Sequence, residues 1–302
     1  MSKRSRTSRR LLVAAATTPV LALALTACGS GNGSAMPGTD QAGTPSHSAS
    51  ADAMASMPGM DAASTGNGLA AAQDGYRMTS PTADVPADRS ADYRFTVTGP
   101  AGKPVTDFTV DQTKRMHFYA VRTDLTGFQH LHPTMASNGT WTAPLAALRP
   151  GTWRLYASFT PATGSGKGKD FVLSRTVKVP GMPMPTSLPT ASGTTTVDGY
   201  TIAVKGDLMA GMAHRLTATV TKNGKPVTDL QPYLDTYAHL TAFHQGDLSF
   251  AHLHPETRAD GDRGGPALTF HAEFAQSGNW RLFLQFQTGG KLHTAALTLH
   301  VN

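Results

Sequence analysis

The most regular pattern along the chain is an alternation of apolar and polar residues in short runs. In Trp280–Gln287 a large apolar side chain stands at every second position, and Trp153–Phe159 shows the same alternation. Successive side chains of a β-strand point to opposite faces of the sheet, so such runs indicate half-buried strands. Glycine, proline, asparagine and aspartate separate the runs, and no segment of helical period reaches a dozen residues. We therefore predict an all-β protein.

The alternating pattern belongs to a longer unit that occurs twice. Gly102–Asp107 (GKPVTD) returns at Gly224–Asp229, and Phe128–Pro133 (FQHLHP) returns as FAHLHP at Phe250–Pro255, both 122 positions later. The two tryptophan runs also match each other. The chain therefore contains an internal duplication, and each copy is referred to below as a repeat.

Short strands with regular turn signals are typical of antiparallel β-sandwiches. We expect two tandem sandwiches, at residues 72–179 and 197–302, of immunoglobulin-like or cupredoxin-like type, and the sequence leaves both types open. Residues 180–196 are rich in proline and methionine and are expected to link the repeats. Residues 28–71 are rich in glycine, serine, alanine and methionine, which predicts a flexible tether.

The first 27 residues have the organisation of a bacterial lipoprotein signal peptide. Basic residues precede an apolar stretch at Leu11–Thr26 that is too short to span a bilayer comfortably. Leu25–Cys28 (LTAC) resembles a lipobox, in which the cysteine is acylated and becomes the new N-terminus. We therefore expect Cys28 to anchor an extracytoplasmic protein to the outer face of the cytoplasmic membrane. An ordinary cleavage site with a free thiol is the alternative, and the general secretory and twin-arginine export routes both stay open.

Net charge and cysteine content limit the partners and the metal ligands that the sequence allows. The formal net charge is +6, and removing the five basic residues of the signal segment leaves about +1. This small remainder gives no reason to expect a nucleic-acid partner. Because Cys28 is the only cysteine and is expected to be acylated, disulfides and thiolate metal sites are excluded. A metal would have to be held by histidine, methionine, carboxylate or backbone groups.

Each repeat carries three histidines at the same spacing: His117, His130 and His132 in the first, and His239, His252 and His254 in the second. A hairpin that turns near Gln245-Gly246 places His239 opposite His252, and a turn shifted by one residue places it opposite His254. Either register puts the three imidazoles on one face, because side chains alternate with period two. Imidazole is a good ligand for copper, zinc and nickel, so each triplet is a candidate metal site.

A structural role for these histidines is the competing interpretation. A histidine on a half-buried strand is often a packed polar residue, and a recent duplication would preserve the spacing without selection for metal. A fourth ligand in repeat 2 is expected at His293, which shares its parity with apolar residues of its strand. Its counterpart in repeat 1 is near Phe171, beside Asp170, so that site would be weaker or open.

Methionines in the segments outside the repeats favour copper. Met57 and Met60 lie in the tether, and Met182 and Met184 lie in the linker. Thioethers are soft donors that favour Cu(I), and low-complexity composition is the alternative explanation. Copper is therefore the expected ion, and zinc is the second candidate.

Catalytic patterns are sparse. Glutamate occurs only at Glu256 and Glu273, and there is no nucleophile elbow, phosphate-binding glycine loop or cysteine nucleophile. The sequence thus favours a protein that is not an enzyme, although it leaves a metalloenzyme open.

The segment from His117 to Met135, with the matching segments around His239–Pro255 and Lys291–Leu297, resembles a group of secreted proteins and lipoproteins of actinobacteria. The resemblance covers roughly residues 74–301, and it implies an extracytoplasmic β-protein with a link to metals. We therefore expect a metal-binding protein that exchanges its ion with a donor or acceptor protein. The alternative is an adhesion or assembly module with structural histidines.

Overall fold

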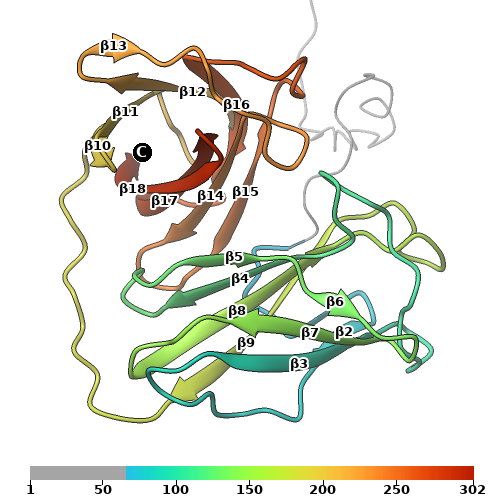
Figure 1. Cartoon of the computed structure of the whole chain (residues 1–302). Coiled ribbons are helices and arrows are strands. Elements are labelled where there is room, and N and C mark those ends of the chain that lie inside the picture. Colours follow the sequence, from blue (N-terminus) through green and yellow to red (C-terminus); the bar gives the residue numbers. More distant parts are fainter. Residues whose placement is uncertain (1–65) are drawn as a thin grey trace, which may run out of the picture. The chain divides into compact units, whose positions relative to one another are not determined.

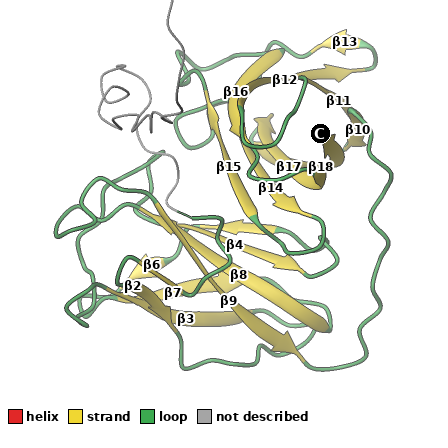
Figure 2. Cartoon of the chain, turned by 180° about the vertical axis from the view of Figure 1, so that it is seen from behind, coloured by secondary structure: helices red, strands yellow, loops and turns green. Residues whose placement is uncertain are grey.

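The computed structural model describes residues 66–302, apart from the side chain of His252. The predicted signal peptide, Cys28, Met57, Met60 and most of the tether lie outside the described residues. Within them, all regular structure is β-strand (Figure 2), and every ladder between two strands is antiparallel. The prediction of an all-β protein built from two repeats is confirmed. The described part of the chain contains no helix that could span a membrane.

Repeat 1 is a sandwich of two sheets (Figure 1). The first sheet has the order β1-β2-β3-β7-β6, with strands at Ala72–Gln73, Tyr76–Thr79, Ala91–Thr98, Thr140–Leu145 and Thr134–Met135 in that order. The second has the order β5-β4-β8-β9, with strands at Gln129–Leu131, His117–Arg122, Gly151–Phe159 and Phe171–Val179.

In repeat 2 the two layers are joined into one continuous sheet. Its order is β10-β11-β12-β16-β15-β14-β17-β18, and β13 pairs with β12. The strands in chain order are Thr194–Val197 (β10), Tyr200–Lys205 (β11), Ala213–Lys222 (β12), Lys225–Pro226 (β13), Ala238–His244 (β14), Phe250–Pro255 (β15), Ala267–Glu273 (β16), Gly278–Thr288 (β17) and Lys291–Val301 (β18). The first strand therefore begins inside the segment that was predicted to be linker, because Thr194–Val197 pairs with β11.

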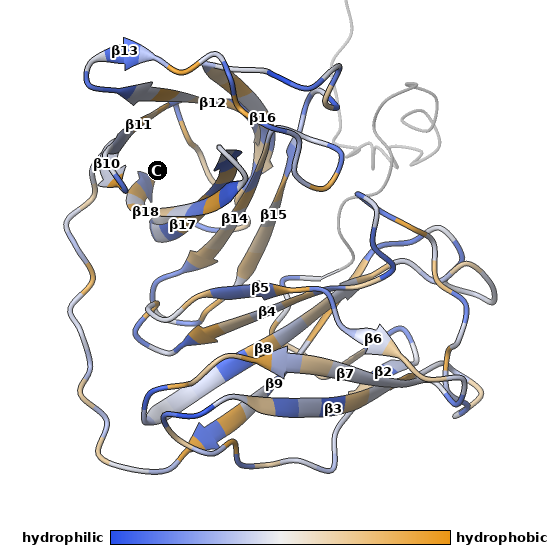
Figure 3. Ribbon diagram, in the orientation of Figure 1, coloured by the Kyte–Doolittle hydropathy of each residue, from blue (hydrophilic) through white to orange (hydrophobic). Residues whose placement is uncertain are grey.

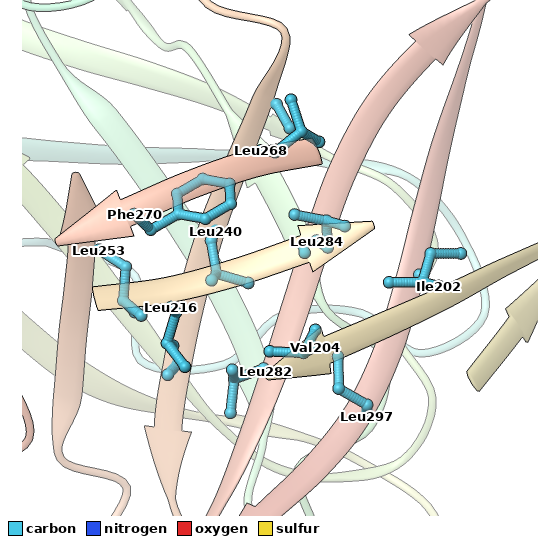
Figure 4. Close-up of a cluster of buried hydrophobic side chains, with 14 of the residues drawn as sticks. Ile202, Val204, Leu216, Leu240, Leu253, Leu268, Phe270, Leu282, Leu284 and Leu297 are labelled. Carbon is cyan, nitrogen blue, oxygen red and sulfur yellow. The ribbon is translucent and has the colours of Figure 1, made fainter. Parts of the chain in front are cut away.

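Alternation along the strands builds a separate core in each repeat. Colour bands along β3 (Figure 3) follow the switch between buried and exposed positions. In repeat 1, the ring of Phe95 lies 5.0 Å from that of Phe118 and 6.3 Å from that of Trp141. Figure 4 shows the corresponding cluster of repeat 2, where leucine, isoleucine, valine and phenylalanine side chains from facing strands meet. Burial of this apolar surface is the main force that holds each sandwich together.

β4 and β14 break the alternation because they are buried on both faces. All residues of β4 are buried, and so are the first six of β14. One face of each strand contributes to the core of its own repeat. The other face contributes to a third apolar cluster, against which the half-buried Phe128 packs and which contains residues of both repeats: Tyr119, Val121, Leu125, Tyr156, Val172, Phe243, Leu248, Phe250 and Phe283. We call this cluster the inter-repeat core.

The inter-repeat core has approximate two-fold symmetry. β4 pairs with β8 in repeat 1 as β14 pairs with β17 in repeat 2, so β4 corresponds to β14 and β8 to β17. Phe128 is then equivalent to Phe250, and Tyr156 is equivalent to Phe283. The rings of Phe128 and Phe283 stack at 4.2 Å, and the equivalent pair, Phe250 and Tyr156, is 5.7 Å apart. The repeats therefore meet through equivalent surfaces, as the subunits of a symmetric dimer do.

Candidate metal centre

The hairpin of β4 and β5 brings the three histidines of repeat 1 together. In its ladder Phe118 pairs with Leu131, and Tyr119 pairs with His130. The same register, continued by one step, sets His117 opposite His132. Directly opposed residues of an antiparallel pair share a face, and so do residues two positions apart. All three imidazoles therefore lie on one face of the sheet.

The three side chains are close enough to share one ion. Nδ1 of His117 lies 3.0 Å from Nε2 of His130. The ring of His132 lies 5.2 Å from that of His117 and 4.7 Å from that of His130. One nitrogen from each of the three residues lies within 4.8 Å of the other two. A small movement of the side chains would place all three at the distance of about 2.0 Å from a metal that imidazole ligands adopt.

Oxygen acceptors orient two of the rings from outside the cluster. Nε2 of His117 lies 3.1 Å from the carbonyl oxygen of Asp111 and donates to it. Nδ1 of His130 lies 2.8 Å from Oε1 of Gln285, whose amide nitrogen in turn donates to Thr294. Metal-bound histidines commonly donate their second N–H to an oxygen in this way. Repeat 2 supplies Gln285, so both repeats build the site.

These contacts need more protons than neutral imidazoles supply. With Oε1 of Gln285 as the acceptor, the contacts of His117 with Asp111, of His117 with His130 and of His130 with Gln285 each require one imidazole proton. Two neutral rings carry two N–H groups in total. With both given to the oxygens, the lone pairs of His117 Nδ1 and His130 Nε2 face each other. A cation between these nitrogens would turn their repulsion into attraction.

His132 adds a buried ring nitrogen, Nε2, to the cluster. This nitrogen has no hydrogen-bond partner within the described part of the chain. A buried polar atom without a partner costs free energy, and native proteins rarely keep one without a reason. Coordination of an ion would satisfy it.

Burial keeps the cluster neutral. It lowers the pKa of His117, and it lowers the pKa of His130 well below the ordinary value with the help of repulsion from its two neighbours. The pKa of His132 is lowered to about 3 by burial and then by repulsion from His117 and Lys114. Burial lowers the pKa of His239 to about 4. At neutral pH these imidazoles are in the unprotonated form that binds metals.

In repeat 2 the hairpin adopts the second of the two predicted registers. Leu240 pairs with Leu253, and the turn lies between His244 and Ser249, so His239 stands opposite His254. His239 is buried, and its Nε2 lies 2.9 Å from the carbonyl oxygen of Tyr233. The backbone of His252 pairs with Thr241.

The other two histidines of the triplet in repeat 2, His252 and His254, lie on β15. His254 is exposed and lines the same pocket as His117 and Asp111. His252 occupies the ladder position that His130 occupies in repeat 1.

The structure does not bring His293 to the other histidines of its repeat. His239 stands beside Gln285 in the ladder, whereas His293 stands beside Phe286, which points to the opposite face. Nδ1 of His293 lies 2.7 Å from Oδ2 of Asp198, and its Nε2 contacts a threonine hydroxyl. The expectation of a fourth ligand at His293 is therefore wrong, because parity with the core residues turns this ring into the sandwich and away from the inter-repeat face.

The linker methionines lie at the surface. Met182 and Met184 are 88% and 81% exposed, so they are not core residues. The backbone carbonyl of Met184 accepts a hydrogen bond from Arg122, which ties this part of the linker to repeat 1. Met57 and Met60 lie outside the described residues.

Sequence reasoning missed the residues that orient the ligands. Gln285 stood out only as a polar position in the alternation of its strand, and the carbonyl groups of Asp111 and Tyr233 leave no mark in the sequence. Gln285 can be recognised once the pairing of β14 with β17 is known, because Gln285 pairs with His239.

Taken together, fold and site define a tandem β-sandwich protein with a buried histidine cluster where its repeats meet. The family model of the domain of unknown function DUF8832 matches residues 71–178 and 195–302, and the chain belongs to this family. The two matches agree with the internal duplication. No match to this sequence was found among curated proteins.

Three solved structures show weak likenesses to this chain. A DUF4426 family protein of Pseudomonas aeruginosa has a TM-score of 0.27 at 8% identity, over 36% of this chain and 96% of its own. The adhesin InvE of Yersinia pseudotuberculosis has a TM-score of 0.22 at 14% identity, over 74% of this chain and 58% of its own. The Escherichia coli adhesin FdeC has 0.24 at 14%, over 76% and 65%. Likenesses at this level carry no argument about function.

Proposed function

We propose that this chain is a metal-binding protein and that His117, His130 and His132 hold one transition-metal ion. The observation that carries the proposal is the pair of ring nitrogens of His117 and His130, 3.0 Å apart, with the opposite nitrogen of each ring facing an oxygen. This arrangement matches the needs of a cation better than those of a hydrogen bond. The buried Nε2 of His132 supplies a third ligand.

The ligand set favours copper, with zinc as the second candidate. Neutral imidazoles suit both ions, and the only cysteine is Cys28, so thiolate ligands do not compete. The exposed thioethers of Met182 and Met184 are suited to capture Cu(I) and pass it on. The proposed activity is thus copper binding and handling, with exchange of the ion with a donor or acceptor protein.

The proposed location is the outer face of the cytoplasmic membrane, with a lipid anchor at Cys28. The support is the sequence of residues 1–28, which resembles a lipoprotein signal ending in a lipobox. Mass spectrometry of the membrane-extracted protein tests it. The expected result is a diacylated N-terminal Cys28, and an unmodified cysteine or cleavage elsewhere would contradict the anchor.

An adhesion or assembly module with structural histidines is the second candidate. The observation that favours it is the packing of His130, whose ring stacks on Tyr119 at 4.5 Å and bonds to Gln285 across the repeats. Such contacts would hold the two sandwiches together without any ion.

A metal titration of the mature protein separates the two candidates. We would add Cu(II) or Zn(II) to wild type and His132→Ala and measure binding by calorimetry and thermal unfolding. Metal binding predicts a gain of about 2.7 kcal/mol at a hundredfold excess over the dissociation constant. His132→Ala should lose at least about half of this gain, which corresponds to a roughly tenfold weaker affinity, and leave the metal-free protein almost as stable, because the Nε2 that it removes has no partner among the described side chains.

The structural interpretation predicts the opposite pattern. Neither protein would respond to metal, and a His130→Ala variant would lose on the order of 1–3 kcal/mol from its broken buried hydrogen bonds. His300→Ala is the matched control, because its exposed ring is hydrogen-bonded to Asn279 and is not part of the cluster.

A further inference from the structure

We propose that His239 of repeat 2 is the fourth ligand of the same centre, so that one ion is held between the repeats. This inference rests on the proposed metal site of repeat 1 and names a ligand from the other half of the chain. It replaces the picture of one separate ion in each repeat.

Proximity is the first observation. The ring of His239 lies 6.0 Å from that of His130, and His239 is only 4% exposed. Its ladder partner is Gln285, the residue that bonds to His130. The strand pair of β14 and β17 therefore presents a ligand and an orienting amide side by side to the cluster of repeat 1.

The orientation of His239 is the second observation. Its Nε2 donates to the carbonyl oxygen of Tyr233, as Nε2 of its equivalent His117 donates to that of Asp111. Tyr233 and Asp111 are different residue types, but each offers its backbone carbonyl oxygen to the equivalent histidine. In the neutral ring this leaves Nδ1 as the nitrogen with the lone pair. His239 is thus prepared for coordination through the same atom as His117.

The inter-repeat core fixes the distance across the centre. The stacked pair of Phe128 with Phe283 and the equivalent pair of Phe250 with Tyr156 hold the two sheets together. The hydroxyl of Tyr156 also donates to the carbonyl oxygen of Leu248 at 2.6 Å. Since apolar packing already determines the spacing, His239 needs little rearrangement to reach an ion on His130.

Metal binding and docking of the two repeats would therefore be thermodynamically coupled. An ion that binds only when both repeats are docked stabilises the docked form by mass action. Loss of the ion would loosen repeat 2 on repeat 1, and opening of the contact would release the ion. The centre would then be a place where a partner that separates the repeats can remove the metal.

The test compares Cu(II) binding by wild type, His239→Ala and His132→Ala. Calorimetry gives the stoichiometry and affinity, and electron paramagnetic resonance reports the coordinated nitrogens. We expect one ion per chain in wild type, an affinity at least roughly tenfold lower in His239→Ala, and a spectrum that has lost one imidazole. His293→Gln, a change at a buried histidine on the opposite face, and His300→Ala serve as controls and should bind as wild type does.

Hydrogen exchange adds a readout that does not depend on affinity. Cu(II) should slow exchange in β14 of wild type and of the controls, and it should have less effect there in His239→Ala. If His239→Ala matches wild type in affinity, spectrum and exchange, the shared centre is refuted while the site of repeat 1 stands. Two independent ions per chain would refute it equally. Failure of wild type to bind any ion would overturn the proposed function itself.

Discussion

His132 of repeat 1 and its equivalent in repeat 2, His254, differ in how the backbone around them pairs with neighbouring strands. In repeat 1, β5 ends before His132, and the chain resumes in the other sheet as β6 after Pro133. In repeat 2, β15 runs without a break to Pro255, and His254 pairs with His271 of β16. His132 is therefore outside any ladder and turns its Nε2 into the protein, whereas the backbone of His254 is held in the sheet and its side chain is exposed.

This difference shows that a duplicated motif does not necessarily form two equivalent sites. Repeat 1 supplies the three clustered histidines, and repeat 2 supplies Gln285 and His239 from strands that face them. The equivalent of Gln285 in repeat 1 is Ser158, whose side chain is too short to span the same distance.

The largest loss of stability is expected from a substitution in the inter-repeat core. Phe243 is fully buried among four aromatic rings of both repeats, and its equivalent in repeat 1 is the smaller Val121. Phe243→Ala should lower the free energy of unfolding by about 3–5 kcal/mol, because it removes a large apolar group and leaves a cavity. Val121→Ala should cost about half as much. Chemical denaturation measures both, and equal losses would show that the two sides contribute alike.

The second prediction concerns metal affinity. His132→Ala should weaken Cu(II) binding at least roughly tenfold, whereas the equivalent change in repeat 2, His254→Ala, should weaken it less than about threefold. The reason is that only His132 belongs to the group whose ligand atoms converge. Competition titration with a chelator measures both variants. A loss with His254→Ala as large as that with His132→Ala would mean that the two triplets contribute equally.

The third prediction uses the ion pair that holds the linker. Burial raises the pKa of Asp124, but hydrogen bonds from Arg122, Thr126 and Thr186 outweigh it and lower the value to about 2. A carboxyl whose folded pKa is depressed stabilises the fold fully above its unfolded value of about 3.8 and loses that contribution as the pH falls toward 2. Asp124→Asn should therefore be less stable than wild type at pH 6, on the order of 1 kcal/mol after solvent screening.

The difference between Asp124→Asn and wild type should shrink as the pH falls from 4 to 2. Urea unfolding at pH 6, 4 and 2 measures it. A difference that stays constant over this range would contradict the role of the ionised carboxylate.

The smallest effect on stability is expected at the linker. Replacing Met182 and Met184 by leucine should change the free energy of unfolding by less than about 0.5 kcal/mol, because both side chains are exposed. Cu(I) capture should nevertheless become weaker, since leucine has no donor atom. Competition with a Cu(I) indicator dye measures it, and Cu(II) binding at the histidines serves as the internal control. Unchanged Cu(I) capture would remove the methionines from the proposed pathway.

Local pattern was enough to predict the fold class. Alternation with period two and the repeated segments predicted two all-β repeats, because strand faces and a duplication both leave a direct mark in the sequence. It also predicted that His117, His130 and His132 share a face, since both of the hairpin registers considered produce this result. The start of repeat 2 was misplaced because Thr194–Val197 has little apolar signal and is a strand only through its pairing with β11.

Which of these histidines lie close together depends on strand register and on the packing between sheets. The choice between the two hairpin registers depended on the turn at His244–Ser249, and the rejection of His293 depended on the ladder between β17 and β18. The contact of His130 with Gln285 joins residues 155 positions apart in the chain. Short-range patterns determine which face a side chain occupies, whereas packing of the two inner sheets determines what that face meets. Local pattern therefore defines two histidine-bearing sandwiches, and their packing brings His239 and Gln285 of repeat 2 beside the histidine cluster of repeat 1.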